Sequence, residues 1–170
     1  MLKCFFFDRD GVLIKDYGYV YKINHLKWLK GARKAIKFLN EKKIKVVVIT
    51  NQSGVARGYY TENDVKKFHK WMNKILMKYN AKIDNFFYCP YHPRSLIKKY
   101  KKKSNMRKPG NGMLLKSMKE YKFSPKDCFM IGNEINDLIA SVKTNILFEY
   151  KKNYSLDVQV KKIVNRINGI

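Results

Sequence analysis

The sequence predicts an α/β protein built on a mostly parallel β-sheet with helices on both of its faces. Short apolar runs alternate with amphipathic segments along the chain, which is the pattern of strand–helix–strand units. The apolar runs are continuous, as in strands that are covered on both sides. With 170 residues and 45% hydrophobic content, the chain can bury such a core without disulfides, and we expect one domain over residues 1–170.

Five apolar segments are the expected strands. The first, Lys3–Phe7, is an aromatic run that ends at Asp8. The second, Ile44–Ile49, is rich in Val and typical of the interior of a parallel sheet. The remaining three are expected at Asn85–Cys89, Cys128–Ile131 and Ile146–Phe148.

Helices are expected between these strands, where apolar residues recur every three or four positions. The segment Gly31–Lys42 shows this spacing. Thr61 is a suitable N-cap for a second helix that runs to about Tyr79. Pro109 suits the first position of the third helix. This third helix is expected over about Asn111–Tyr121, and two further helices are expected at Glu134–Lys143 and Ser155–Asn168.

The formal net charge of +24 has two interpretations. One is a polyanionic partner such as nucleic acid. The other is codon bias, because 31 of the 37 basic residues are Lys and only 6 are Arg, while Asn and Ile reach 15 each. Proteins that recognise nucleic acids rely more on Arg than on Lys. We therefore favour codon bias and expect no nucleic-acid partner. An attraction for anionic substrates follows in either case.

The cysteines and the apolar runs indicate the cellular compartment in which the protein is expected. Three widely spaced cysteines do not suggest a disulfide framework, and Cys4 and Cys128 are expected in the core. No signal peptide or membrane span is apparent, so we expect a cytoplasmic protein with no membrane partner, and a monomer. His25 and His69 fall on faces expected to be polar and receive no functional role.

The first expected strand ends in Asp8-Arg9-Asp10-Gly11. Side chains two apart in an extended segment point the same way, so the two carboxylates converge and favour a cation between them. An oxygen site with few ligands suits Mg²⁺ in contact with a phosphate. One Asp can attack phosphorus and the other can donate and accept the proton. The alternative is a turn with two solvated acids.

Two other expected strands end in polar clusters at the same edge of the sheet, where parallel folds bind ligands. The segment Thr50–Gly54 offers a hydroxyl and backbone N–H groups for anionic oxygens, although it could be a simple polar turn. The segment Asn133–Asp137 adds amide and carboxylate groups. Arg107 and Lys108 can neutralise charge on a transferring phosphoryl group, although any one Lys of this sequence could be a surface residue.

Together, and in this order, these segments resemble the motifs of the haloacid dehalogenase superfamily. The resemblance narrows to the D-glycero-D-manno-heptose 1,7-bisphosphate 7-phosphatases, with histidinol-phosphate phosphatases as close relatives, and it covers about residues 3–150. The segments that narrow it are Asp16–Val20, Thr50–Gly58, Cys89–Pro93 and Arg107–Pro109.

The resemblance implies a Rossmann-like three-layer sandwich with no large cap domain. It implies a Mg²⁺-dependent phosphatase that works through an aspartyl-phosphate. The implied substrate is a small sugar phosphate, heptose 1,7-bisphosphate, which would lose its 7-phosphate on the route to nucleotide-activated heptose, as in lipopolysaccharide synthesis.

The resemblance also assigns roles by position. Asp8 is implied to be the nucleophile and Asp10 the general acid/base. Mg²⁺ is implied to be held by Asp8, the backbone carbonyl of Asp10 and Asn133. The other implied roles are phosphoryl binding by Thr50, Lys108 and Arg107, and substrate binding by Asp16, Tyr17, Gly18, Tyr19, Asn51, Gln52 and Ser53.

Two positions depart from the family pattern at the expected site. Asn133 stands where the family usually has Asp, so the site loses one negative charge and we expect weaker Mg²⁺ binding than with Asp. Glu134 stands where the family tends to have Lys, so a contact to a substrate phosphate is missing or reversed. Asp137 is a candidate to compensate as a metal ligand or as an acceptor behind the ligands.

The connection over residues 90–108 also departs from the family, which often holds a structural zinc there. Cys89 remains, but Tyr91, Ser104 and Met106 stand in place of the other ligands. A structural zinc site needs four ligands, so we expect no zinc and a looser loop that aromatic side chains partly order.

Three alternatives to the heptose phosphatase remain. The first is histidinol-phosphate phosphatase, against which the Asp16–Val20 segment argues. The second is a phosphatase of nucleic-acid ends, which the net charge would suit. The third is a pseudo-phosphatase that binds sugar phosphate without turnover, motivated by Asn133 and Glu134 but opposed by the retained Asp8 and Asp10.

Overall fold

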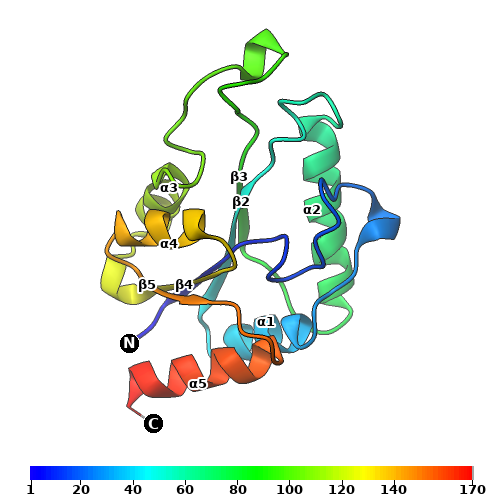
Figure 1. Ribbon diagram of the computed structural model, residues 1–170. Helices are drawn as coiled ribbons and strands as arrows, with labels where there is room; N and C mark the ends of the chain where they lie inside the picture. Colours follow the sequence, from blue (N-terminus) through cyan, green and yellow to red (C-terminus); the bar gives the residue numbers. More distant parts are fainter. Residues whose placement is uncertain (170) are drawn as a thin grey trace.

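The structure is a computed structural model that describes residues 1–169. The described chain forms one five-stranded sheet in which every pair of neighbouring strands is parallel (Figure 1). The strand order is β3-β2-β1-β4-β5, so the first strand lies at the centre. The strands are β1 Cys4–Phe7, β2 Lys45–Asn51, β3 Asn85–Cys89, β4 Cys128–Gly132 and β5 Leu147–Tyr150.

Helices cover both faces of the sheet, so the α/β class is confirmed. Helices α1, α2 and α5 pack on one face and α3 and α4 on the other, and no large cap domain is present in the described residues. The helices are α1 Ala32–Glu41, α2 Glu62–Met77, α3 Gly112–Tyr121, α4 Ile135–Val142 and α5 Leu156–Asn168.

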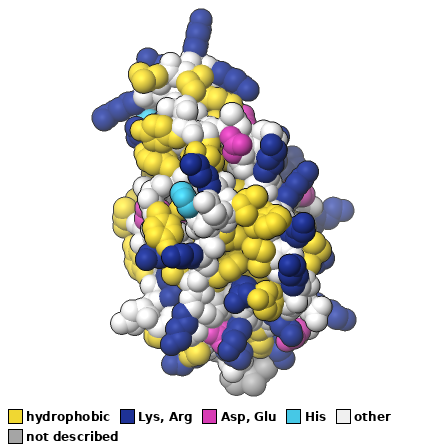
Figure 2. Space-filling model, turned by 90° about the vertical axis from the view of Figure 1, so that its right-hand side faces the viewer, with side chains coloured by type: hydrophobic (Ala, Val, Ile, Leu, Met, Phe, Trp, Pro, Cys, Tyr) yellow, Lys and Arg dark blue, Asp and Glu magenta, His cyan; other side chains and the backbone are white. Residues whose placement is uncertain are grey.

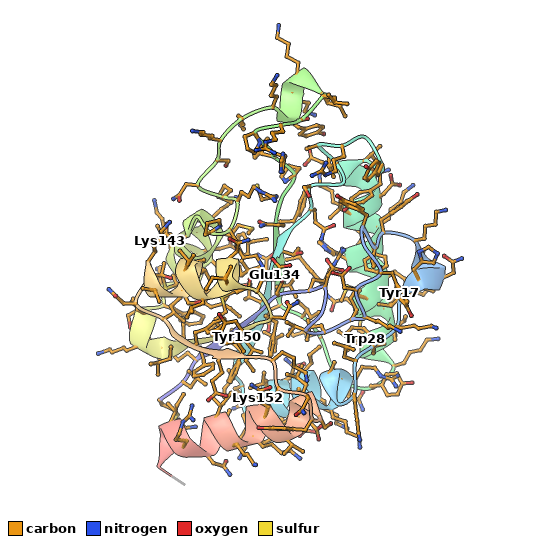
Figure 3. All side chains as sticks on the ribbon, viewed as in Figure 1. Tyr17, Trp28, Glu134, Lys143, Tyr150 and Lys152 are labelled. Atoms are coloured by element: carbon orange, nitrogen blue, oxygen red, sulfur yellow. The ribbon has the colours of Figure 1, made fainter. Side chains whose placement is uncertain are left out.

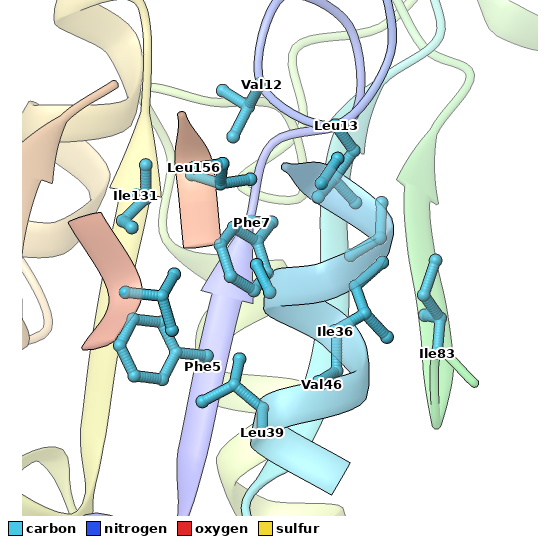
Figure 4. Packing of buried hydrophobic residues seen from close by; sticks show 14 of the residues in the cluster. Phe5, Phe7, Val12, Leu13, Ile36, Leu39, Val46, Ile83, Ile131 and Leu156 are labelled. Carbon is cyan, nitrogen blue, oxygen red and sulfur yellow. The ribbon is translucent and has the colours of Figure 1, made fainter. Parts of the chain in front are cut away.

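Two apolar cores lie on opposite sides of the sheet because side chains alternate along each strand. From β1, Phe5 and Phe7 point to the core beneath α1, α2 and α5 (Figure 4). Cys4 and Phe6 point to the core beneath α3 and α4. All four side chains are fully buried, and each Phe contributes about 1.5–3 kcal/mol on burial. The continuous apolar pattern of the first strand is thereby explained.

Most element ends agree with the sequence to within one or two residues. The N-cap at Thr61 is confirmed: its hydroxyl accepts from the Asp64 N–H at 3.2 Å, and the Asp64 carboxylate accepts from the Thr61 N–H at 2.8 Å. This reciprocal pair is a capping box.

The position expected for Pro109 was wrong. Helix α3 begins at Gly112, with Asn111 as N-cap, and Pro109 lies in the turn before it. The Asn51 side chain holds the Lys108 backbone through two hydrogen bonds of 3.0 Å, to its N–H and to its carbonyl. The chain here is therefore engaged with the end of β2, and the helix starts only after it leaves that contact.

The carboxyl ends of the parallel strands share one edge of the sheet, and the predicted motifs lie there. The connection 90–108, with a short 3₁₀ turn at Lys98–Tyr100, extends beyond this edge (Figure 1). Among the described residues, no helix has the length and apolar character needed to span a membrane.

Candidate active site

A cavity of about 360 Å³ opens at the carboxyl edge of the sheet. It brings together almost all of the residues that the sequence predicts for the site, and adds Tyr60 and Asn136, which sequence reasoning missed. The lining residues are Asp8, Asp10, Asp16, Gly18, Tyr19, Thr50, Asn51, Gln52, Ser53, Tyr60, Arg107, Lys108, Glu134 and Asn136.

Tyr17 is one predicted residue that the structure does not place in this cavity. The Asp16 carboxylate accepts a hydrogen bond from the Gly18 N–H at 2.7 Å, and this turn directs the intervening side chain outwards. The Tyr17 ring is 47% exposed and lies beside the ammonium groups of Lys15 and Lys27. Figure 3 shows Glu134 at the start of α4 and Tyr17 well to its right, towards α2.

Asn133 is exposed and does not line the cavity, but its side chain lies against the turn that follows β1. A Cβ at Gly11 would come within 2.4 Å of Asn133 Nδ2, and Gly11 has a φ of +78°. This conformation and this close approach both favour glycine. The turn that follows Asp8 and Asp10 therefore packs against the Asn133 amide, with Nδ2 nearer to Gly11 than Oδ1.

Lys108 is the cation nearest to the predicted nucleophile. Its Nζ lies 3.0 Å from Asp8 Oδ1 and 2.6 Å from Asp137 Oδ1, and it donates to the Ile49 carbonyl at 3.0 Å. Burial raises the pKa of Asp8 to about 7, with Lys108 opposing the shift and Asp137 and Asp10 adding to it. Burial disfavours the charge of Lys108, but the two carboxylates outweigh it and raise its pKa. Lys108 thus stays charged and favours the ionised, nucleophilic form of Asp8.

Asp10 is held from two sides. The guanidinium of Arg9, which is fully buried, donates from Nε and Nη2 to its carboxylate at 3.1–3.2 Å. Gln52 Nε2 donates to Asp10 Oδ2 at 3.1 Å and to Thr50 Oγ1 at 2.9 Å. Gln52 Oε1 accepts from Arg9 Nη2 at 3.2 Å and from the Tyr60 hydroxyl at 2.8 Å.

These contacts use both ends of the Gln52 amide. Its side chain therefore aligns Asp10 and Thr50 more directly than it offers free groups to a substrate. Arg9 is a residue of this site that sequence reasoning missed. Its signal was a charged side chain between two acids at the end of a buried strand.

Arg107 and Glu134 face the outer part of the cavity. Burial lowers the pKa of Arg107, and its buried Nη1 has no hydrogen-bond partner within the described residues. A buried donor without an acceptor is costly, and an anionic substrate group would satisfy it. The Glu134 carboxylate lines the same cavity and would repel a negatively charged substrate group there.

The cavity itself is not basic, although the protein is. Its lining has two cations, Arg107 and Lys108, and four carboxylates. Figure 2 shows Lys and Arg side chains spread over the face that it presents, up to the projecting loop at the top. The net charge of +24 is thus mostly outside the site.

The connection 90–108 is packed by aromatic rings. The ammonium of Lys102 lies 3.8 Å from the centre of the Tyr91 ring, and Tyr100 stands 6.3 Å from Tyr91. Cys89 is buried. In residues 1–169, no group of three or more His, Cys, Asp and Glu side chains is arranged to hold a metal. The predicted Mg²⁺ site differs from such a group because it uses a backbone carbonyl and an amide.

The expectation that His69 lies on a polar surface was wrong. His69 is 5% exposed. Its ring stacks on Phe86 with centroids 4.2 Å apart, and its Nε2 lies 3.3 Å from Arg9 Nη1. The fully buried guanidinium of Arg9 provides His69 with a polar partner inside the protein. The sequence around His69 gives no sign of this distant partner. His25, in contrast, is exposed as expected.

The fold and the arrangement of this edge, together with the family match and the relatives given next, define the class: the protein is a phosphatase of the haloacid dehalogenase type. A family model described as polynucleotide kinase 3 phosphatase matches residues 3–164. The chain therefore belongs to this phosphatase family. Its curated relatives include heptose bisphosphate phosphatases.

Two curated relatives carry the name D-glycero-β-D-manno-heptose-1,7-bisphosphate 7-phosphatase. The protein from Haemophilus influenzae is 39% identical over 151 residues, which cover 86% of this chain and 82% of that protein. The protein from Escherichia coli K12 is 33% identical over 141 residues, which cover 83% and 74%.

A solved structure has the same fold. The D,D-heptose 1,7-bisphosphate phosphatase from B. bronchiseptica, complexed with magnesium and phosphate, superposes with a TM-score of 0.80 at 23% identity. The match covers 97% of this chain and 99% of that one.

Proposed function

We propose that this protein is a Mg²⁺-dependent phosphatase that removes the 7-phosphate of D-glycero-D-manno-heptose 1,7-bisphosphate. The observation that carries the proposal is the 3.0 Å contact between Lys108 Nζ and Asp8 Oδ1 in a cavity that also contains Asp10. Relatives at 33–39% identity, named for this activity, support the choice of substrate. Such an enzyme acts on a small soluble molecule, and we propose that it does so as a cytoplasmic, single-domain monomer without nucleic-acid or membrane partners.

In the first chemical step, a carboxylate oxygen of Asp8 attacks the phosphorus of the substrate. The new bond is an acyl-phosphate, and the bond from phosphorus to the sugar oxygen breaks. Asp10 donates its proton to the leaving oxygen. Thr50 and Lys108 hold the oxygens of the transferring group, because the Thr50 hydroxyl and the Lys108 ammonium both reach the cavity beside Asp8.

In the second step, water attacks the phosphorus of the aspartyl-phosphate. Asp10, now a carboxylate, accepts a proton from that water, inorganic phosphate leaves, and Asp8 is regenerated. Asp10 must stay aligned in both steps, and its bonds to Arg9 and Gln52 provide that alignment.

The residues around Asp8 fit Mg²⁺. Asp8, the carbonyl of Asp10 and the Asn133 amide would offer oxygen ligands, and Mg²⁺ binds with few protein ligands and a phosphate. The close packing of Asn133 on Gly11 supports a shared site. When bound, the ion would neutralise charge on the phosphate and on Asp8.

The outer part of the cavity would select the substrate. Asp16, Gly18, Tyr19 and Ser53 line it and would contact the sugar. Tyr17 lies outside it, so we propose no direct contact from its ring. The unpartnered Nη1 of Arg107 is the group best suited to a second phosphate.

A second candidate is histidinol phosphate, favoured by one observation. Glu134 and Asp16 place two carboxylates at the outer cavity, and a cationic amine would suit them better than a second phosphate.

A pseudo-phosphatase is opposed by the intact contacts of Asp8, Asp10 and Lys108.

The test is phosphate release with Mg²⁺ and with EDTA, and with Asp8→Asn as the blank. The panel holds both anomers of heptose 1,7-bisphosphate, histidinol phosphate and a 3′-phosphorylated oligonucleotide. Release from a heptose bisphosphate that requires Mg²⁺ and Asp8 is expected. Faster release from another member reassigns the substrate, and binding of the heptose without release supports the pseudo-phosphatase.

A further inference from the structure

His69 is a buried polar residue that the proposed mechanism does not use. It lies on α2, and its ring contacts two rings of β3: it stacks on Phe86 with centroids 4.2 Å apart and makes an edge contact with Tyr88 at 6.0 Å. Its Nε2 faces Arg9 Nη1 at 3.3 Å. The ring thus joins helix α2 to the turn that carries the two catalytic aspartates.

Arg9 needs this contact because its guanidinium is fully buried. Nε and Nη2 are used on Asp10, and Nη2 also donates to the Val20 carbonyl at 2.6 Å and to Gln52. Within the described residues, His69 Nε2 is the acceptor that faces Nη1. Without His69, Nη1 would be a buried donor that lacks an acceptor, which is unfavourable, and this would favour a different orientation of the guanidinium.

The direction of this hydrogen bond fixes the form of the imidazole. A guanidinium nitrogen can only donate, so Nε2 of His69 must accept. The ring is then neutral, with its proton on Nδ1. Burial and the positive charge of Arg9 lower the pKa of His69 well below its ordinary value, which agrees with this form.

We propose that His69 is a positioning residue for the general acid/base: it accepts a hydrogen bond from Arg9 and so holds the guanidinium in the orientation in which its other edge aligns Asp10. His69 touches no substrate, and the inference rests on the proposed role of Asp10. Lys108 is not in this chain of contacts, and Thr50 is linked to it only through Gln52, so phosphate binding should depend on His69 much less than the alignment of Asp10 does.

The effect of losing His69 depends on the leaving group. A sugar oxygen needs a proton from Asp10 as it leaves, whereas a nitrophenolate leaves as an anion. Removing an outer residue that orients a metal ligand costs about 10–100-fold, and we expect a similar cost for a residue that orients the general acid/base. For His69→Leu we expect this loss in kcat/KM for the sugar phosphate, with a much smaller loss for p-nitrophenyl phosphate and KM within about twofold.

Two further variants separate positioning from packing. His69→Gln keeps an acceptor, its amide oxygen, and should restore most of the activity that His69→Leu loses. Phe86→Leu removes the ring that stacks on His69 but leaves the hydrogen bond, and should retain the wild-type ratio of the two substrates. Equal losses on both substrates, or an equal loss in all three variants, would overturn the proposal.

A measurement on the wild-type protein covers the case in which a variant does not fold. ¹⁵N-histidine NMR at neutral pH should show His69 with Nδ1 protonated and Nε2 bare. A proton on Nε2 would refute the inference. If the wild type releases no phosphate from either substrate, the proposed function fails, and the NMR result still decides the His69–Arg9 contact.

Discussion

Lys108 and Asp137 form a buried ion pair, with 2.6 Å between Nζ and Oδ1 and side chains that are 3% and 1% exposed. Asp137 also accepts the backbone N–H groups of Asn133 and Glu134 at 3.0 Å. It therefore joins the cation beside the nucleophile to the start of α4. Asp137 thus holds both Lys108, which favours the ionised form of Asp8, and the segment that carries Asn133.

Replacing Lys108 should cost both stability and activity. Lys108→Met leaves the buried acids Asp8 and Asp137 without their cation. Breaking a buried pair by removing one partner costs about 3–5 kcal/mol, so we expect the unfolding free energy in urea to fall by this amount in metal-free buffer. Phosphate release should be lost.

The matched control is Lys119→Met, an exposed lysine on α3. Its unfolding free energy should stay within about 0.5 kcal/mol of wild type. If both variants lose the same stability, the ion pair is not the cause.

The sequence predicts the strands and the site edge well because both depend on local patterns. Continuous apolar runs give the buried strands, and the parallel order brings their polar ends to one edge. Asp8 and Thr50 could be placed together on this basis. The capping box at Thr61 is equally local, since it needs only Asp64 three positions on.

What the sequence could not predict depends on residues far apart in the chain. Arg9 and His69 meet across 60 positions, and Asn51 holds Lys108 across 57. The first pair turns a residue expected on the surface into a buried one. The second delays the start of α3 beyond Pro109. Neither partner carries a local pattern that indicates the other.

His69 also predicts how stability depends on pH. Its pKa is lowered in the folded protein by burial and by Arg9, whereas the unfolded chain takes up a proton near pH 6.5. The unfolded state then binds more protons, so stability falls as pH falls below this value. Between pH 7.5 and 5.5 the wild type should lose about 1.4 kcal/mol more than His69→Gln.

Urea unfolding at several pH values measures this difference. His25→Gln, at an exposed position, is the control and should follow the wild type. Parallel curves for wild type and His69→Gln would show that the buried ring takes up a proton without cost.

Asn133 should limit the affinity for Mg²⁺. Asn133→Asp adds a carboxylate at the proposed metal site, and one unit charge at about 4 Å is worth about 1 kcal/mol in water and more inside a protein. We expect Mg²⁺ to bind at least about fivefold tighter. The Mg²⁺ concentration that protects each protein from thermal unfolding gives the comparison.

Asn136→Asp adds the same charge three residues further on, in the first turn of α4 and at the cavity wall. It should tighten binding less, because the charge is not at a ligand position. Equal titration midpoints for wild type and Asn133→Asp would contradict a ligand role for Asn133.

Glu62 is expected to order the connection 90–108 in place of a metal. Its carboxylate accepts from the Tyr88 hydroxyl at 2.8 Å and from the Tyr100 hydroxyl at 2.9 Å, so it ties β3 and the loop to the first turn of α2. Hydrogen bonds to a charged group contribute about 1.5–3 kcal/mol each. Glu62→Ala should therefore speed tryptic cleavage in Lys98–Lys103 by about tenfold or more.

Mass spectrometry of the first fragments identifies the cleavage site. Asn63→Ala, an exposed neighbour on the same turn, should be cut at the wild-type rate. EDTA should leave the wild-type rate unchanged, because the carboxylate and the aromatic rings hold the loop. Faster cleavage with EDTA, together with stoichiometric zinc in the untagged protein, would mean that a metal orders this segment after all.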